Sequence, residues 1–312
     1  MGFDFSLVSA PFRMQPGLRR IAPGTPHLTP NRLGDRTLTE KLAVLSAHRE
    51  QAFVADPAFD ARDAVAALAE CALAEHPEAF SRTGVGGFVA HQIGWSLTGD
   101  RFVGEGPAEI GACLQVLPTP WRLAGLLSLA FAEDFAVIDG ASATIPWLAV
   151  CLPSSWAPQD KVGRHFGAVH APVADNEVLV AAGDHLARLV TGGDRWERFV
   201  WTLTADPRLD RHPQRVAPVA WDPGLDPDAL AGSAFLRSER QTFIPVPTTG
   251  LAVFTIHVEV EPLRSAIRSA ADARRLHAAL STMSPAVLAY RGLTAARDRL
   301  LAWLGGMAAT AH

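Results

Sequence analysis

Residues 236–262 read LRSERQTFIPVPTTGLAVFTIHVEVEP. Apolar or β-branched residues alternate with polar ones through much of both halves, which is typical of β-strands with two different faces. The segment PTTG separates the halves and favours a turn. The stretch therefore predicts a β-hairpin whose strands cover 236–247 and 250–262.

Three further stretches predict strands of the same sheet because they are short, apolar and bounded by turn-forming residues. They are FAVID (135–139), WLAVCLP (147–153) and RFVWTLT (198–204). Together with the hairpin they favour one mostly antiparallel sheet.

Helical periodicity predicts the remaining elements. Helices are expected at 38–53, 59–76, 110–132 (interrupted at Pro118 and Pro120), 175–193, 262–282 and 285–305. Strands in the middle and helices at both ends indicate an α+β fold, with the helices on one face of the sheet. We expect a single domain over 1–312: an N-terminal arm and helices (1–110), a core (about 111–260) and C-terminal helices (261–312).

Composition excludes several classes of function. The net charge is −4 with interspersed signs, so neither nucleic acid nor a membrane surface is an expected partner. No run of 18 apolar residues is present, and the start of the sequence lacks the pattern of a signal peptide. Three widely spaced cysteines fit reduced thiols in a cytoplasmic protein. Neither GxGxxG nor GxxxxGK[ST] opens a predicted helix, so a nucleotide site is not expected.

The stretch CLPSSWAPQDKVGRHFGAVHAP (151–172) contains two histidines five residues apart. Two histidines that bind one metal ion from the same helix face are usually four residues apart, so this spacing does not suit such a site. Small apolar residues surround His170, whereas His165 follows the polar DKVGR segment. His170 could bind a haem iron, but on the residues alone a structural histidine is the simpler interpretation. The serines of CLPSSW lack a nucleophile elbow and favour a helix N-cap.

The first hairpin strand carries charges on both faces. Its alternation places Arg237 and Glu239 on one face and Ser238 and Arg240 on the other. A solvated edge strand explains this pattern. The alternative is that one arginine points into a pocket and binds a carboxylate. His257 on the second strand is interpreted as a histidine of the sheet surface.

Several blocks of the sequence resemble the haem-dependent oxidative N-demethylase family. They are PFRMQPGLR (11–19), AEDFAVID (132–139), WLAVCLPSSWAPQDKVGRHFGAVHAPV (147–173), the strand with Trp201, FLRSERQTFIPVPTTGLAVFTI (235–256) and MSPAVLAYRG (283–292). Two positions depart from the family pattern: IPVP lacks an arginine before the first proline, and His257 stands where an arginine is usual.

The resemblance implies a haem-b-binding fold related to PAS domains, with helical additions. It implies oxidative N-demethylation of a small secondary or tertiary amine with O2, releasing formaldehyde. The electrons come from a separate NADPH-dependent reductase with flavin (FMN) and iron–sulfur groups, and a further subunit handles the one-carbon product. A non-catalytic haem- or ligand-binding PAS-like sensor or carrier is the alternative, which the lack of a recognisable output domain disfavours.

Site residues follow from the resemblance. His170 is the candidate axial ligand of the haem iron. Arg237 and Arg240 are candidate propionate or substrate-side groups, and Arg19 could close the pocket. The candidate catalytic carboxylates, which suit a cationic amine, are Glu133, Asp134 and Glu239.

Overall fold

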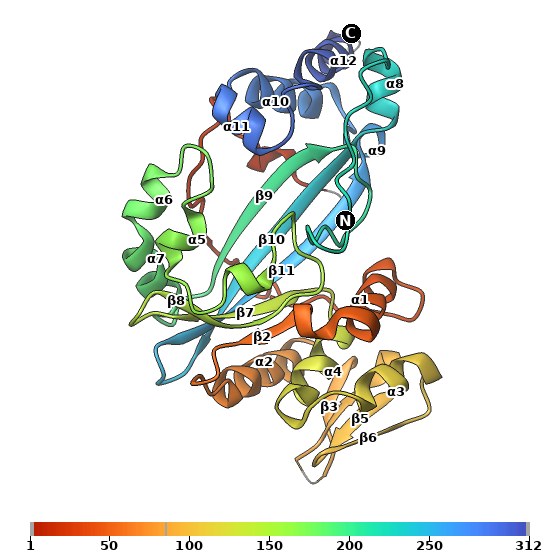
Figure 1. The fold of residues 1–312 in the computed structure, drawn as a ribbon, viewed down its shortest axis with the longest axis vertical. Helices are drawn as coiled ribbons and strands as arrows, with labels where there is room; N and C mark the ends of the chain where they lie inside the picture. Colours follow the sequence, from red (N-terminus) through yellow and green to blue (C-terminus); the bar gives the residue numbers. More distant parts are fainter. Residues whose placement is uncertain (1–2, 85, 310–312) are drawn as a thin grey trace.

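The computed structural model describes residues 3–84 and 86–309, and a seven-stranded antiparallel sheet is its centre (Figure 1). In spatial order the strands are β1 (Arg19–Arg20), β9 (Trp196–Thr204), β10 (Phe235–Val246), β11 (Leu251–Pro262), β7 (Asp134–Asp139), β8 (Thr144–Ala149) and β2 (Phe53–Ala55). All five predicted strands are present and belong to this sheet, so the predicted α+β class is confirmed.

The predicted hairpin consists of β10 and β11, which pair along their full 12-residue lengths. Thr248 and Gly250 in the turn have φ of 64° and 71°, the left-handed conformation that glycine adopts without strain. Strand β9 pairs with the other edge of β10, and Ser238 lies opposite both Trp201 and Glu259. The hairpin is thus an interior part of the sheet, with a neighbour on each side.

Twelve α-helices lie in the described part of the chain. They are α1 (Arg36–Ala52), α2 (Arg62–Glu75), α3 (Ala108–Gln115), α4 (Arg122–Ala130), α5 (Phe166–His170), α6 (Glu177–Ala181), α7 (Gly183–Val190), α8 (Pro227–Gly232), α9 (Leu263–Ala266), α10 (Ala270–Ser281), α11 (Pro285–Tyr290) and α12 (Arg297–Ala309). None of them is long and apolar enough to cross a membrane. The expected helices at 175–193, 262–282 and 285–305 are each divided into two.

The helices cover both faces of the sheet, so the expectation that they lie on one face is wrong. Side chains of successive strand residues point to opposite faces. Phe243 packs with Ala187 of α7, whereas Ile244 belongs to the core cluster that includes Leu68 of α2. We call these the α7 face (Arg237, Glu239, Gln241, Phe243) and the α2 face (Ser238, Arg240, Thr242, Ile244).

A second, small antiparallel sheet lies where only helices were expected within 1–110. It contains β3 (Phe80–Arg82), β4 (Phe88–Ala90), β5 (Trp95–Thr98) and β6 (Arg101–Gly104), in that order. Gly111 of α3 lets this sheet pack closely, because a Cβ there would come within 2.2 Å of the Trp95 ring. Strands of three or four residues are too short for a periodic signal, which is why the sequence did not predict them.

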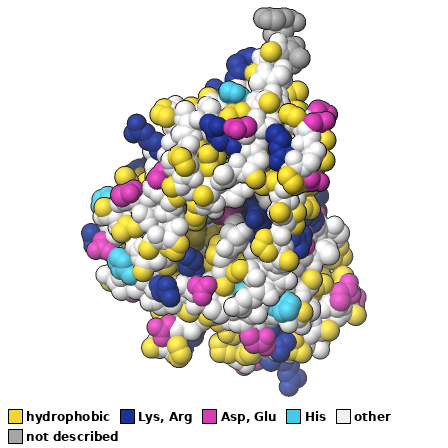
Figure 2. Space-filling model, turned by 45° about the horizontal axis from the view of Figure 1, so that its top comes forward, with side chains coloured by type: hydrophobic (Ala, Val, Ile, Leu, Met, Phe, Trp, Pro, Cys, Tyr) yellow, Lys and Arg dark blue, Asp and Glu magenta, His cyan; other side chains and the backbone are white. Residues whose placement is uncertain are grey.

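Charged side chains are dispersed over the face of the molecule that Figure 2 shows. Figure 2 shows Lys, Arg, Asp and Glu side chains interspersed on one face of the molecule, with hydrophobic atoms between them. This agrees with the mixed charge pattern of the sequence and its small net charge of −4.

Candidate functional site

His170 lies over the α7 face of the sheet, at the end of α5. The preceding residue, Val169, packs with Ala136 and Leu148, and Phe254 packs against the same cluster. Phe254 pairs directly with Phe243, which defines this face. The helix therefore holds His170 on the same side of the sheet as Arg237 and Glu239.

The imidazole of His170 has one nitrogen engaged and one open. Nδ1 lies 2.9 Å from the carbonyl oxygen of Phe166, so it carries the proton and donates. Burial lowers the pKa of His170 to about 4, with smaller contributions from the positive charges of Arg198 and Lys161. At neutral pH the ring is uncharged, and the Nε2 lone pair has no hydrogen-bond partner among residues 3–84 and 86–309.

Neighbouring groups hold this histidine in place. The rings of Phe166 and His170 lie 4.1 Å apart. The side-chain amide of Asn176 donates to the carbonyl oxygens of His170 and Ala171, at 3.0 and 2.8 Å. Asn176 is also the N-cap residue of α6, so its side chain connects the start of α6 to the end of α5.

His165 has a structural role. It is the N-cap of α5, where Nδ1 accepts from the backbone N–H of Gly167 at 3.1 Å. Nε2 lies 2.7 Å from a carboxylate oxygen of Asp184. The side chain is 46% exposed, whereas that of His170 is half-buried, which agrees with the polar segment before His165 and the apolar neighbours of His170.

Glu239 lies at the centre of a polar row on the α7 face. Ser154 donates its hydroxyl to Oε1 of Glu239, and Gln241 donates to Oε2 at 2.6 Å. The expectation that a serine of CLPSSW caps a helix is wrong, because Ala157 is the N-cap of the short helix that follows (Pro158–Asp160). A carboxylate has about four acceptor sites, so Glu239 can still accept from a bound molecule.

Arg237 is 2% exposed, and the protein itself uses its donors. Nε donates to Ser154 Oγ at 2.8 Å, and the terminal nitrogens donate to the carbonyl oxygens of Arg208 and Leu209 at 3.0 Å each. Burial lowers the pKa of Arg237 to about 10. This guanidinium ties the loop after β9 to the sheet, and a role as propionate anchor remains a prediction.

Arg198 of β9 is a candidate that the sequence did not single out. It lies directly opposite Gln241, and burial lowers its pKa, partly offset by the charge of Glu239. Its Nε is buried without a hydrogen-bond partner among the described residues. A buried guanidinium with a free donor is unfavourable unless it has an anionic partner. The alternation of RFVWTLT would have placed Arg198 on one face with Val200, but it could not say which face.

Arg19 and Arg240 lie on the α2 face. Both donate to Glu197, from their Nε atoms, at 2.8 and 2.9 Å. Arg240 also donates to the carbonyl oxygen of Pro26 at 2.8 Å. The structure therefore does not bring these two arginines together with His170 on one face of the sheet.

Glu133 and Asp134 are both buried, and each holds backbone in the core. Glu133 accepts from the Thr29 N–H at 2.9 Å, and Asp134 accepts from the Leu152 N–H at 2.7 Å. Lys41 lies 3.2 Å from the other oxygen of Asp134. Neither carboxylate has a described contact with Glu239, and their catalytic roles remain predictions.

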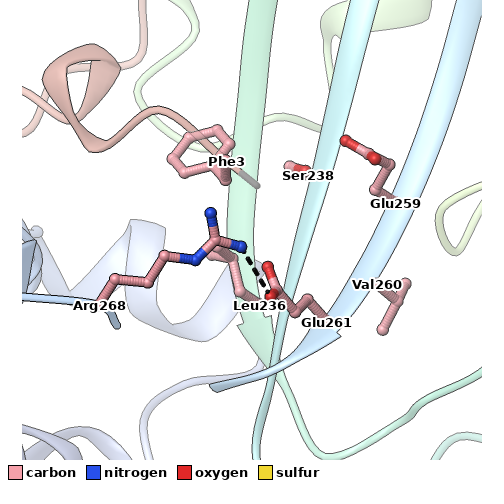
Figure 3. Close-up of a pocket in the computed structure, with 7 residues that line it drawn as sticks. All are labelled: Phe3, Leu236, Ser238, Glu259, Val260, Glu261 and Arg268. Atoms are coloured by element: carbon pink, nitrogen blue, oxygen red, sulfur yellow. Dashed lines mark hydrogen bonds and ion pairs between the residues drawn. The ribbon is translucent and has the colours of Figure 1, made fainter. Parts of the chain in front are cut away.

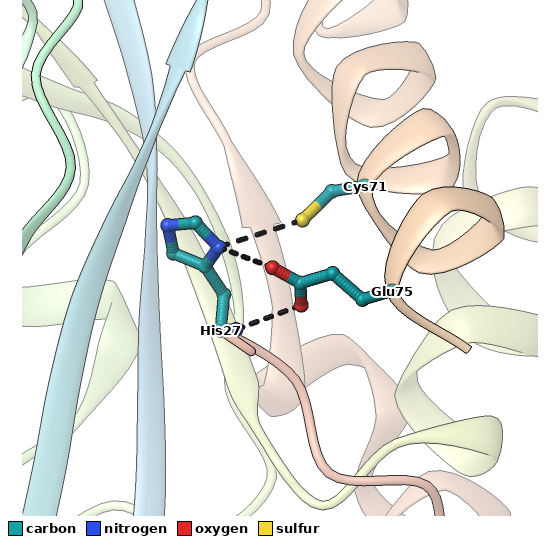
Figure 4. Close-up of side chains that lie close together, drawn as sticks. All are labelled: His27, Cys71 and Glu75. Carbon is teal, nitrogen blue, oxygen red and sulfur yellow. Dashed lines mark hydrogen bonds and ion pairs between the residues drawn. The ribbon is translucent and has the colours of Figure 1, made fainter. Parts of the chain in front are cut away.

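Two further histidines lie among titratable groups. His257 faces Glu133, with 3.5 Å between Nδ1 and Oε1. His27, Cys71 and Glu75 lie close enough together to ligate a metal (Figure 4). Arg195, however, donates to Glu75 at 3.2 Å and lies 3.1 Å from His27 Nδ1. A guanidinium at this position repels a cation, so we interpret the cluster as the attachment of the N-terminal arm to α2.

Comparison with known families assigns the chain to a class of haem proteins. The model of the family described as haem-dependent oxidative N-demethylase, alpha subunit-like, matches residues 35–301. The chain belongs to this family, and the predicted resemblance is confirmed.

The residues on the α7 face fit a haem. His170 presents a neutral imidazole whose Nε2 is open, oriented by its other nitrogen. Arg198 supplies a buried guanidinium whose Nε has no partner within residues 3–84 and 86–309, and haem propionates are anions that a guanidinium binds well. The fit therefore rests on one possible iron ligand and one possible propionate partner on the same face.

Proposed function

We propose that this protein is a haem-b-dependent monooxygenase subunit that removes an N-methyl group from a small secondary or tertiary amine. The observation that carries the proposal is His170. Its Nδ1 donates to the carbonyl oxygen of Phe166, burial keeps the ring neutral, and Nε2 has no hydrogen-bond partner in the described part of the chain. Haem, when bound, supplies the oxidative chemistry with O2.

In this proposal His170 would bind the haem iron through Nε2. A neutral imidazole needs no deprotonation before it binds iron, and the hydrogen bond to Phe166 fixes both its tautomer and its orientation. Because the free side chain has a pKa of about 6.5, burial extends the neutral form to pH values well below 6. Metal binding at His170 should therefore persist under mildly acidic conditions.

Arg198 is the proposed partner of a propionate. Its pairing with an anion would relieve the cost of burying an unpartnered guanidinium Nε. The donors of Arg237 already bind Ser154 and two carbonyl oxygens. Arg237 therefore has an indirect role in this proposal, which is to hold the strand and the loop around Glu239 in position. Arg240 and Arg19 remain candidates only if the cofactor also reaches the α2 face.

Glu239 is the proposed binding group for the amine. Small amines are cationic at neutral pH, and a carboxylate on a partly buried surface is a suitable counter-ion. The hydrogen bonds from Ser154 and Gln241 fix the carboxylate and leave acceptor sites for a substrate N–H. Glu239 would orient the methyl-bearing nitrogen and hold its proton, which is a positioning and proton-holding role.

Electrons come from another protein in this proposal. The family is described as an alpha subunit, which implies further subunits. A separate NADPH-dependent reductase with FMN and an iron–sulfur centre is the proposed donor.

The decisive experiment supplies the purified, haemin-loaded protein with a chemical reductant, O2 and dimethylamine, and measures formaldehyde. We expect formaldehyde that depends on O2, on the amine and on haem, and that is strongly reduced in Glu239→Gln. The proposed enzymatic activity would be refuted if the protein binds haem but releases no formaldehyde, even with the reductase. This outcome must hold for dimethylamine, trimethylamine and longer N-methylamines. It would favour a PAS-like sensor or carrier.

A further inference from the structure

A cavity lies on the α2 face, at the open end of the hairpin and away from His170. Its volume is about 280 Å³. The lining residues come from the start of the chain, from both hairpin strands and from the segment before α10: Phe3, Leu236, Ser238, Glu259, Val260, Glu261 and Arg268 (Figure 3).

Two polar side chains in this cavity make no hydrogen bond or ion pair with any described residue. Ser238 and Glu259 lie directly opposite each other on β10 and β11. Ser238 is only 6% exposed, yet its hydroxyl has no hydrogen bond to any described residue. Glu259 is exposed, and its carboxylate likewise has no described ion pair or hydrogen bond. Buried hydroxyl groups are usually hydrogen-bonded to protein or to water. The Ser238 hydroxyl, on the cavity lining, is therefore available to a ligand that displaces water there.

The rest of the lining determines the charge and shape of a ligand. Glu261 is paired with Arg268 at 3.1 Å, so these two charges offset each other. The remaining uncompensated charge is that of Glu259, and the cavity therefore favours a cation. Phe3 and Leu236 supply apolar surface beside it, and Figure 3 shows Phe3 near Ser238.

We propose that this cavity binds a small organic ammonium ion with a short alkyl group. Glu259 and Ser238 accept its N–H groups, and Phe3 and Leu236 contact its alkyl part. A cavity of this volume accepts a ligand of a few heavy atoms, at the small end of binding sites. The proposal does not depend on haem, because Ser238 lies on the opposite side of the sheet from Glu239.

Calorimetric titration of the haem-free protein with n-propylammonium chloride tests the proposal, at constant ionic strength set by sodium chloride. We expect saturable 1:1 binding in the parent, about tenfold weaker binding in Glu259→Gln, and weaker binding in Ser238→Ala. Glu109→Gln is the matched control, because Glu109 is exposed, lies on α3 and is far from the lining residues. This variant should bind like the parent.

Two comparisons separate the ammonium ion from other occupants. Tetramethylammonium has no N–H to donate, and n-propanol has no charge, so both should bind at least about tenfold more weakly than propylammonium. Equal binding by parent and Glu259→Gln, or calcium binding tighter than propylammonium, would overturn the proposal. Unfolding curves of each variant show whether a lost signal reflects lost folding.

Discussion

Arg237→Met should destabilise the haem-free protein, because hydrogen bonds from the guanidinium connect the sheet to the loop after β9. The side chain makes hydrogen bonds of 2.8, 3.0 and 3.0 Å to Ser154, Arg208 and Leu209. Each buried acceptor left unpaired costs about 1–3 kcal/mol. Removing a buried charge offsets part of this loss, so we expect a net loss of about 3 kcal/mol in the free energy of unfolding.

The assay is thermal unfolding of the apoprotein followed by circular dichroism. With about 2.1 cal/mol/K of unfolding entropy per residue, a chain of 312 residues changes its Tm by about 1.5 °C per kcal/mol. Arg237→Met should thus lower Tm by about 5 °C. Arg164→Met is the control, because Arg164 is exposed and has no described side-chain hydrogen bond, and its Tm should stay within about 1 °C. An unchanged Tm together with a large loss of haem affinity in Arg237→Met would refute this reasoning and make Arg237 a propionate anchor.

Three further predictions concern the α7 face. Arg198→Met should leave the apoprotein Tm unchanged or raise it, since it removes a buried Nε that has no partner among the described residues. The same variant should weaken haem binding by about tenfold or more in a haemin titration, and unaltered haem affinity would remove Arg198 from the site. His170 has a folded-state pKa of about 4 against 6.5 for the free side chain, so between these pH values the unfolded chain binds a proton that the folded chain does not. The free energy of unfolding of the apoprotein should therefore fall as pH drops from about 6.5 to about 4. Urea titrations should show a smaller fall for His170→Asn, and the difference between the two proteins should approach about 3 kcal/mol below pH 4. Parallel pH profiles of the two proteins would contradict this prediction. Glu239→Gln should keep the haem spectrum but lose at least about tenfold in kcat/KM for the amine, and equal kinetics would exclude Glu239 from substrate binding.

The sequence predicted the sheet well and the helical parts less well. The hairpin of β10 and β11 was predictable because a two-residue period continues over 12-residue strands on either side of a turn. The break between α6 and α7 coincides with a tertiary contact, because a Cβ on Gly183, the first residue of α7, would approach the Phe166 ring to 3.2 Å. A contact between segments so far apart leaves no periodic signal in the sequence.

The site could be predicted only in part, for the same reason. The apolar neighbours of His170 and the family blocks indicated this histidine, and its open Nε2 agrees with that interpretation. Strand alternation correctly separated Arg237 from Arg240, yet the partners of both lie far away in the sequence. Those of Arg237 are on loops, and those of Arg240 are on β9 and on the N-terminal arm. Ser154 and Glu197 occupy donors that the sequence left available for a ligand. Arg198 was missed because alternation does not say which face of β9 meets α5.

The most direct test of the proposed haem site is the absorption spectrum of the haemin-loaded protein and two histidine variants. Haem in its site should give a Soret band at about 400 nm. We expect His165→Ala to reproduce the parent spectrum, and His170→Gly to lose haem or shift the band, with added imidazole restoring it. A His170→Gly spectrum identical to that of the parent, without imidazole, would contradict the assignment of His170 as the iron ligand.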